Sequence, residues 1–338
     1  MKLEVLGGCG EYGRNCFYVE INGEAILLDC GIMNDATQQL PDLTQQHVDK
    51  LQAVFISHLH QDHVGALSLL VDYQYQGPVI VSDVTHQWLP QTLPLNFKIF
   101  KNHMRRNWQK VTDHLEFFWG YSGHVIGSTW FSIMFNKKRI FFSGDASLTS
   151  TLYPLESPPR LNYELAILDS GNVGKRTDNL RSKEQMLARL HAYPQHEFAV
   201  ASKYTAKALE LLLFFYQHTN RMLVVDTDMH EWLLFHEKNH ALVLRRSQRL
   251  ISQLLQSERL KVEEECLQGI YFYKEPTKLP PTTFDQSLND FPFKSHLDTS
   301  EIYYLENYID AKETLYFHSP LLNEQTNMDE ILTIEKVE

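Results

Sequence analysis

Cysteine is scarce in this chain. The 338 residues contain only Cys9, Cys16, Cys30 and Cys266, and no two of them form a Cys-x-x-Cys pair. This spacing gives no sign of a thiolate metal site, and it predicts reduced thiols in a cytoplasmic protein.

Long apolar runs are also missing. The longest, Leu209 to Tyr216, is interrupted by Glu210 and is far too short to span a bilayer core of about 30 Å. The chain begins with an expected strand, Lys2 to Leu6, in place of a charged leader and an apolar run. The sequence therefore predicts no export and no membrane contact.

Positive charge is in deficit, because 31 Lys and Arg residues face 42 Asp and Glu residues and leave a net charge of -11. This balance argues against a protein whose whole surface binds nucleic acid. The segment Phe97 to Lys110 is an exception, with five cations, no acid, and the interleaved aromatic residues Phe100 and Trp108. Its composition is typical of a patch that tracks a nucleic acid strand, with Arg105 and Arg106 as predicted substrate contacts. An ordinary solvated face is the alternative.

One short segment carries the densest set of metal-binding side chains. Residues 58–63 read His-Leu-His-Gln-Asp-His and follow the apolar run Ala53 to Ile56, which is best interpreted as a buried strand. Side chains on an extended chain repeat every two residues, so His58 and His60 point to the same side. Both imidazoles can therefore reach one cation.

The other two metal-binding residues of this segment, Asp62 and His63, face elsewhere. A helix expected over His63 to Tyr73 turns Asp62 and His63 toward a second point, so two ions fit where one would be crowded. The alternative is a polar loop that contains histidines by chance. The arrangement of three histidines and one aspartate favours the metal interpretation.

A strand that ends in His-x-His-x-Asp-His resembles the metallo-β-lactamase superfamily of two-metal hydrolases. Three further segments resemble the other motifs of that superfamily in the same order. They are Ala25 to Leu28 followed by Asp29-Cys30-Gly31, Ser122 to Ser128 with His124, and Phe141 to Gly144 followed by Asp145. The resemblance implies that Asp29 supports the metal-binding loop without ligating, that His124 is a ligand, and that Asp145 bridges both metals.

The second half of the chain resembles the β-CASP nucleases, and RNase J most of all. The strand Leu165 to Asp169 delivers an acid to the same edge, as in motif A of that family. Phe293 to Asp298, with His296, resembles motif B, and Thr314 to His318 resembles motif C.

The resemblance implies a role for each of these residues. One metal would be held by His58, His60, His124 and Asp145. The second would be held by Asp62, His63, Asp145 and His318, with Asp62 also counted as catalytic. Asp169 would raise the pKa of His296, whose imidazole protonates the leaving oxygen, while a hydroxide shared by the two ions attacks phosphorus. The ions are expected to be zinc, with manganese as the alternative, because nitrogen and oxygen ligands accept both.

Departures from the family pattern concern the substrate side. Motif C continues as Ser319-Pro320, without the glycine and acid that usually follow the histidine. Residues 202–205 stand where larger relatives have a phosphate-binding loop. Lys203 could contact phosphate there, with an ordinary solvated lysine as the alternative. Ser170 is a further candidate for substrate contact.

The order of elements predicts an α/β fold with two mixed sheets packed face to face and helices outside. The resemblance identifies it as a metallo-β-lactamase αββα sandwich with an inserted β-CASP-like α/β cap domain. The expected boundaries are 1–190 for the first part of the metallo-β-lactamase domain, 191–289 for the cap, and 290–338 for the return to that domain with a C-terminal tail. The return is required because His318 has to reach the metals.

The expected function is metal-dependent hydrolysis of phosphodiester bonds in nucleic acid, as by an RNase J-like ribonuclease on single-stranded RNA. RNA is favoured because RNA-acting β-CASP members tend to have His at motif C, where the DNA-repair members have Val. The alternatives are a DNA nuclease, a small-molecule hydrolase of the same superfamily, and a non-catalytic RNA-binding partner subunit. Simple hydrolases need no pair like Asp169 and His296, and inactive subunits usually lose metal ligands. A homodimer is one option for the oligomeric state.

Overall fold

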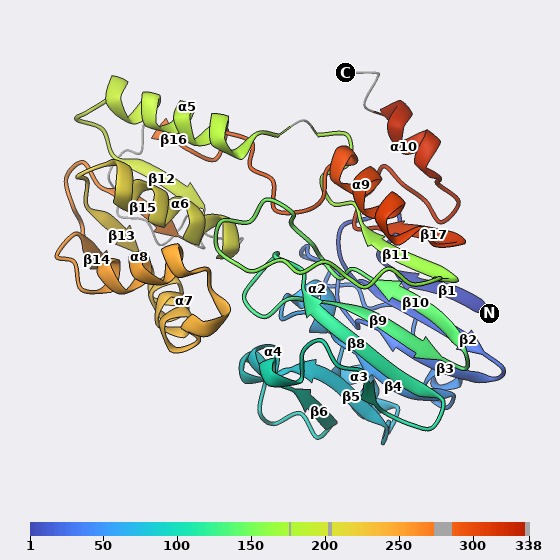
Figure 1. Ribbon diagram of the computed structural model, residues 1–338. Coiled ribbons are helices and arrows are strands. Elements are labelled where there is room, and N and C mark those ends of the chain that lie inside the picture. The colour runs from blue at the N-terminus through green and yellow to red at the C-terminus, as the bar shows by residue number, and fades with distance from the viewer. Residues whose placement is uncertain (176, 202–204, 274–285, 335–338) are drawn as a thin grey trace. The chain divides into compact units, whose positions relative to one another are not determined.

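The computed structural model describes residues 1–338 except 176, 202–204, 274–285 and 335–338. The chain divides into two compact units (Figure 1). Unit 1 comprises Met1–Thr149, Leu155–Lys175 and His296–Glu338, and unit 2 comprises Ser150–Pro154 and Arg176–Ser295. Along the sequence, unit 2 is therefore inserted into unit 1.

The boundaries of unit 2 differ from those predicted for the cap, 191–289. Helix α5 (Asn179–Ala192) belongs to unit 2, where its Lys183 forms an ion pair with Glu210 of helix α6 (Thr205–His218). The short segment Ser150–Pro154 also belongs to unit 2. The sequence gives no local signal of these boundaries, because the partners are far apart in the chain.

The first sheet of unit 1 contains six strands in sequence order. The first three form antiparallel hairpins, and the remaining neighbours pair in parallel. The tight turn after the second strand is Asn22-Gly23, and both residues have positive φ, as a two-residue hairpin turn requires. The strands are β1 (Lys2–Gly7), β2 (Cys16–Ile21), β3 (Glu24–Leu28), β4 (Leu51–Phe55), β5 (Pro78–Ser82) and β6 (Asn96–Phe100).

The second sheet of unit 1 has the order β17-β11-β10-β9-β8-β7. Its strands are β7 (Gln109–Lys110), β8 (Leu115–Tyr121), β9 (Thr129–Phe135), β10 (Lys138–Phe142), β11 (Leu165–Asp169) and β17 (Glu313–Phe317). The strands β10, β11 and β17 pair in parallel, with Asp169 opposite Phe317. Their carboxyl ends therefore meet at one edge of the sheet, and His318 emerges beside the end of β11.

Aromatic side chains fill the space between the two sheets. The rings of Phe17 on β2 and Phe317 on β17 have centroids 5.1 Å apart, and those of Phe55 on β4 and Phe117 on β8 have centroids 5.6 Å apart. All four side chains are buried. The two sheets are therefore stacked face to face over a common core.

Helices cover the outer faces of both sheets. Val48 of α1 (Gln45–Val48) and Leu70 of α3 (Ser68–Asp72) belong to the core cluster on the first sheet. Ile302 of α9 (Thr299–Ile309) and Ile331 of α10 (Met328–Ile334) belong to the cluster on the second, and Figure 1 shows both helices beside β17 and β11. Another helix, α4 (Asp83–Trp88), follows β5. The predicted α/β sandwich with outer helices is confirmed.

The helix predicted over His63 to Tyr73 is wrong in its extent. The structure has two short helices, α2 (Gln61–Val64) and α3, with a turn between them. The backbone N–H of Ala66 donates to the Cys30 carbonyl at 3.0 Å, and Cys30 N–H donates to the His63 carbonyl at 2.8 Å. These bonds interrupt the helix and fasten the histidine-rich segment to the chain that leaves β3.

Unit 2 is a smaller α/β layer structure. Its five strands have the order β14-β13-β15-β12-β16, and every pair is parallel, which agrees with the expected α/β character of the cap. The strands are β12 (Phe198–Ala201), β13 (Leu223–Val225), β14 (Leu260–Val262), β15 (Ile270–Tyr273) and β16 (Gln286–Ser287). The described part of this unit also contains the α-helices α7 (Thr227–Lys238) and α8 (Arg245–Leu255).

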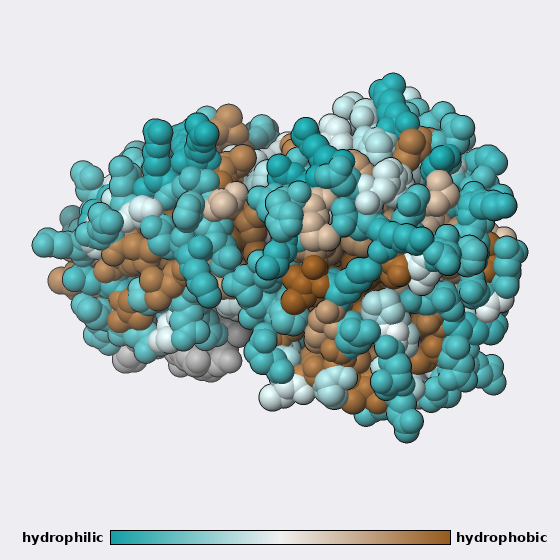
Figure 2. Space-filling view, turned by 60° about the horizontal axis from the view of Figure 1, so that its bottom comes forward, coloured by the Kyte–Doolittle hydropathy of each residue, from teal (hydrophilic) through white to brown (hydrophobic). Residues whose placement is uncertain are grey.

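Among the described residues, no helix combines the length and apolar character needed to cross a membrane. On the face drawn in Figure 2, hydrophilic side chains predominate and hydrophobic ones occur in small groups.

Candidate metal centre

Four of the predicted ligands meet at the strand ends of unit 1. Nε2 of His58 lies 3.0 Å from Nδ1 of His60, and Nε2 of His124 lies 3.2 Å from the same atom. A carboxylate oxygen of Asp145 lies 3.6 Å from His58 and 3.5 Å from His124. One ligand atom from each of the four residues lies within 4.8 Å of all the others.

A second group of four adjoins the first and shares Asp145 with it. Nε2 of His63 and Nδ1 of His318 lie 3.2 Å and 3.3 Å from Oδ1 of Asp145. Oδ2 of Asp62 is 3.7 Å from Nε2 of His318. All four residues are buried, and their ligand atoms again lie within 4.8 Å of one another.

The chemistry of these groups fits bound cations. Burial lowers the pKa of His58 well below its ordinary value and that of His60 to about 4, so both rings are neutral near pH 7. Neutral imidazole is the form that binds metal. Ring nitrogens that face one another, with carboxylate oxygens beside them, form a set of donors suited to divalent ions. The residues present therefore fit a pair of divalent ions.

Asp29 and Ser57 hold two of these histidines. Asp29 lies directly after β3, and its Oδ2 is 2.6 Å from Nδ1 of His63, which leaves Nε2 of His63 directed at Asp145. The Ser57 hydroxyl donates to Asp29 at 2.7 Å and lies 3.0 Å from Nδ1 of His58. A carboxylate that accepts from the far nitrogen of a ligand histidine fixes its tautomer and orientation.

The carboxylates determine the charge of His63. Burial lowers its pKa, but Asp145, Asp62 and Asp29 outweigh burial and raise that pKa well above its usual value. The ring therefore carries a second proton when only protein groups surround it. A divalent cation at Nε2 would take the place of that proton.

Gly31 and Gly144 allow the loops to approach closely. A Cβ at residue 31 would lie 1.7 Å from the Asp62 carbonyl oxygen. A Cβ at residue 144 would lie 2.6 Å from Cβ of Ser57, and Gly144 also has a φ of +52°. Both glycines are needed to bring the loop that carries Asp145 and the histidine-rich segment together.

Asn15 is a further residue of this centre that the sequence did not reveal. Its side chain is fully buried, with Nδ2 3.0 Å from Nε2 of His63 and 3.4 Å from Oδ2 of Asp62. An asparagine that precedes a strand within a glycine-rich stretch carries no signal of such a role. Only the spatial neighbourhood indicates that Asn15 contacts two predicted ligands.

Asp169 and His296 form a pair at the edge of the cluster. Nδ1 of His296 lies 3.2 Å from Oδ2 of Asp169 and 3.7 Å from Oδ2 of Asp145. Burial opposes charge on the ring, yet Asp169 and then Asp145 raise the pKa of His296 to about 9. The His296 side chain retains 17% exposure, whereas His58 and His63 have none. A solvent-facing, protonated imidazole can donate a proton to a bound molecule.

The predicted substrate contacts are placed differently. Ser170 is buried, and its hydroxyl donates to the Phe317 carbonyl, which joins β11 to β17. Arg105 and Arg106 both lie near Glu156, at 3.3 Å and 3.4 Å. Lys203 lies outside the described residues. For all four, contact with a substrate stays a prediction.

Comparison with known proteins places this geometry in context. A family profile described as the metallo-beta-lactamase superfamily matches residues 9–189. The chain is 25% identical over 217 residues to the transcription termination factor FttA of Methanosarcina mazei, covering 55% of this chain. It is 31% identical over 180 residues to Integrator complex subunit 11 of Danio rerio, covering 44% of this chain. An RNase J-like protein of Methanocaldococcus jannaschii is 28% identical over 169 residues, covering 46% of this chain.

These alignments cover 34%, 30% and 39% of the three relatives, so the chain spans about a third of their length. A solved structure supports the fold over nearly the whole chain. It is a protein of unknown function from Enterococcus faecalis V583, with a TM-score of 0.60, 11% sequence identity, and coverage of 96% of this chain and 95% of that one.

Proposed function

Because the chain belongs to the metallo-β-lactamase superfamily, we propose that it is a metal-dependent phosphodiester hydrolase that cleaves single-stranded RNA. The superfamily predicted from the sequence is confirmed. The predicted likeness to RNase J is also confirmed, since one relative bears the name RNase J-like protein.

One observation carries the proposal, namely the position of the Asp169–His296 pair beside both ligand groups. Ligand atoms of Asp145, Asp169, His296 and His318 lie within 4.8 Å of one another. A proton donor thus adjoins a site for two cations, which is the combination that phosphodiester hydrolysis needs. A superfamily member that acts on a lactone or thioester has no need of this pair.

Each of the two ligand groups would hold one cation. His58, His60, His124 and Asp145 would hold one cation, and Asp62, His63, Asp145 and His318 would hold the other. When bound, two such ions lower the pKa of water and stabilise the negative charge that develops at phosphorus. Zinc is the expected ion, with manganese next, because imidazole nitrogen suits zinc and carboxylate oxygen suits both.

His296 would hold and deliver the proton. Its Nδ1 faces Asp169, so Nε2 is the ring nitrogen available to donate to the leaving oxygen. Asp169 keeps the imidazole oriented and favours its protonated form.

RNA is the proposed substrate for two reasons. Motif C ends in His318, the residue type that RNA-acting β-CASP proteins tend to have there, and one relative is named an RNase J-like protein.

We assign unit 2 the role of the β-CASP-like cap. The cytoplasm is the proposed location, since the four cysteines are free thiols that a reducing compartment would preserve.

The test is cleavage of end-labelled single strands. Purified protein loaded with zinc or manganese is incubated with RNA and with DNA of the same sequence, with and without a chelator. Chelator-sensitive cleavage of RNA is expected, with slower or no cleavage of DNA, and the product ladder gives the direction of attack.

Two controls separate the alternatives. Bis(p-nitrophenyl) phosphate reports phosphodiester hydrolysis without a nucleic acid, and a lactone and a thioester report a small-molecule hydrolase. A protein that holds two metal equivalents yet cleaves no phosphodiester would contradict the proposal and leave the non-catalytic RNA-binding subunit as the better account.

A further inference from the structure

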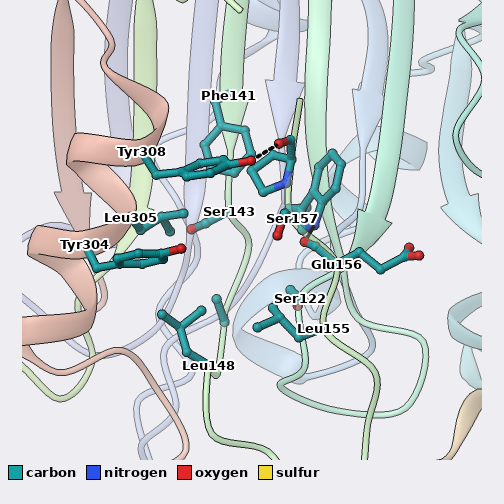
Figure 3. A pocket seen from close by; sticks show the side chains of 13 residues that line it. Ser122, Phe141, Ser143, Leu148, Leu155, Glu156, Ser157, Tyr304, Leu305 and Tyr308 are labelled. Atoms are coloured by element: carbon teal, nitrogen blue, oxygen red, sulfur yellow. Dashed lines mark hydrogen bonds between the residues drawn. The ribbon is translucent and has the colours of Figure 1, made fainter. Parts of the chain in front are cut away.

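A pocket lies on the outer side of the second sheet, between its strands and helix α9. Its volume is about 270 Å³, just below the range of about 300–1,000 Å³ for small-molecule sites. It has room for one planar ring system. The walls come from β9, β10, α9 and residues around 146–148 and 155–158 (Figure 3). We call it the tyrosine pocket, after Tyr304 and Tyr308 of α9.

Aromatic and aliphatic faces dominate this pocket. The rings of Tyr304 and Tyr308 stack with centroids 6.2 Å apart, and Figure 3 shows their hydroxyls turned toward the pocket. Leu148 and Leu155 lie on the side of Tyr304 away from Tyr308 (Figure 3). Tyr304 is 59% exposed, so one face of its ring is open to a ligand.

Two polar groups of the lining already have partners. The Tyr308 hydroxyl donates to the Pro158 carbonyl at 3.1 Å, and Nε1 of Trp130 donates to the Glu156 carbonyl at 2.7 Å. These two groups are therefore not free to bond a ligand, which would be held mainly by stacking and apolar contact. Stacking of this kind binds nucleobases without strong preference for their sequence.

Three arginines contact residues that line the pocket, and the lining itself contains one carboxylate. Arg160 lies over the Tyr308 ring with its guanidinium carbon 4.5 Å from the centroid. Arg105 and Arg106 share Glu156, which is the one charged residue among the described residues that line the pocket. Positive charge is therefore in excess at the rim although the whole chain is acidic. An aromatic site with cations at its rim is complementary to a base with its phosphates.

The pocket adjoins the candidate metal centre through the backbone. Ser122 lines the pocket, and its hydroxyl donates to the Asp145 carbonyl at 2.7 Å. Ala146, the next residue after Asp145, also lines the pocket. An RNA strand with a base in the pocket would therefore contact residues that lie close in the sequence to two predicted ligands, His124 and Asp145.

We propose that the tyrosine pocket binds one base of single-stranded RNA, stacked between Tyr304 and Leu155, with the flanking phosphates near Arg106 and Arg160. The inference rests on the proposed function and adds a nucleotide subsite to it. Arg105 and Arg106, which the sequence analysis predicts as substrate contacts, lie beside Glu156 of this pocket.

The test compares two neighbouring tyrosines. Tyr304→Ala removes the open stacking face, whereas Tyr303→Ala alters an exposed tyrosine of the same helix that does not line the pocket. Binding of a short phosphorothioate RNA, which resists hydrolysis, is measured by fluorescence anisotropy with the metal-loaded protein. Tyr304→Ala should weaken binding roughly tenfold to a hundredfold, Tyr303→Ala less than about twofold, and Tyr304→Phe should retain wild-type affinity because its ring is unchanged.

A second measurement locates the bound base. RNA that contains 4-thiouracil is photo-crosslinked to the protein, and the attached peptide is identified by mass spectrometry. A crosslink within α9 or residues 155–158 is expected. Crosslinks confined to other segments would overturn the subsite, as would unchanged RNA affinity in Tyr304→Ala. Free nucleoside monophosphate that binds in a Tyr304-dependent way while RNA does not would also overturn it.

Hydrolysis of bis(p-nitrophenyl) phosphate keeps this test apart from that of the proposed function. The small ester does not need the pocket, so wild type, Tyr303→Ala and Tyr304→Ala should hydrolyse it equally. Loss of this activity in every protein contradicts the proposed function. Normal hydrolysis with unaltered RNA binding in Tyr304→Ala contradicts the subsite alone.

Discussion

Nδ1 of His63 lies 2.6 Å from Oδ2 of Asp29, and neither side chain is exposed to solvent. The carboxylate comes from the end of β3 and the imidazole from the first turn of α2, so this contact joins two segments at the core of the site. The same Asp29 accepts hydrogen bonds from the backbone N–H and the hydroxyl of Ser57. One buried carboxylate thus orients the histidine-rich segment at two points.

We expect His58→Ala combined with His60→Ala to remove one metal equivalent and nearly all hydrolysis. The two imidazoles supply half of the protein ligands of that group, and no other nearby side chain in the described part of the chain replaces them. Elemental analysis of the purified variant measures the metal content. Retention of two equivalents would show that these histidines do not bind metal.

His296→Ala should retain both metals and the affinity for substrate but lose roughly 10²- to 10⁴-fold in turnover, the usual effect of a positioned general acid. Asp169→Asn should show a smaller loss. His318→Ala should instead lower metal occupancy, because His318 faces both Asp62 and Asp145. Turnover and metal content are measured on the same preparations. Wild-type rates in His296→Ala would make that residue a bystander, and loss of metal would make it a ligand.

Asn15→Ala should weaken the second metal site selectively. The amide Nδ2 lies 3.4 Å from Oδ2 of Asp62, and loss of such an orienting group typically lowers metal affinity about 10- to 100-fold. Chelator competition measures the affinity of each site. Asn136→Ala is the matched control, since Asn136 donates hydrogen bonds to Ile21 and Glu24, away from the ligands. Equal effects of the two substitutions would reject the role of Asn15.

Arg105→Ala combined with Arg106→Ala should weaken RNA binding and flatten its salt dependence, by about 0.7 in the logarithmic slope for each phosphate that the protein no longer neutralises. A matched pair exists in Lys138 and Lys312, which share Glu164 as the arginines share Glu156. Alanine at both lysines should leave the slope unchanged. If the arginine variant behaves like the lysine variant, the segment is an ordinary solvated face.

The pH dependence of the free energy of unfolding should reveal the buried His236 of unit 2. Burial lowers the pKa of His236 to about 4, while an unfolded histidine titrates near 6.5. The unfolded state then binds more protons between these values, so stability is full above about pH 6.5 and falls by up to about 3 kcal/mol as pH decreases toward 4. His236→Gln should reduce this loss in urea unfolding, and His191→Gln, at an exposed histidine of α5, should not. Equal pH dependence in both variants would contradict the assignment.

Local patterns in the sequence predict much of unit 1. Apolar runs mark the strands, and polar residues shortly after them mark the site, as with His58 after β4 and Asp145 after β10. His318 also follows a strand, β17, but His296 has no comparable local pattern. Only the family resemblance points to their roles, because His318 reaches Asp145 through the parallel pairing of β11 with β17, and His296 reaches Asp169 from a distant part of the chain.

Features that depend on distant partners are not predictable from the sequence. The turn at Ala66 depends on the Cys30 carbonyl, and the pairing of Arg105 and Arg106 depends on Glu156, about fifty residues away. Asn15 likewise belongs to the site only because its loop returns to Asp62. In each case a single long-range interaction determines the outcome, and local propensity carries no information about it.

The parallel pairing of β17 with β11 has a consequence for the timing of protein synthesis. A ribosome completes the other predicted ligands by residue 145, yet His318 follows only after the whole of unit 2 has been made. A nascent chain can therefore fold most of unit 1 without a complete second metal site. If the chain degrades RNA as proposed, we expect a nascent chain to gain this activity only after His318 has been made.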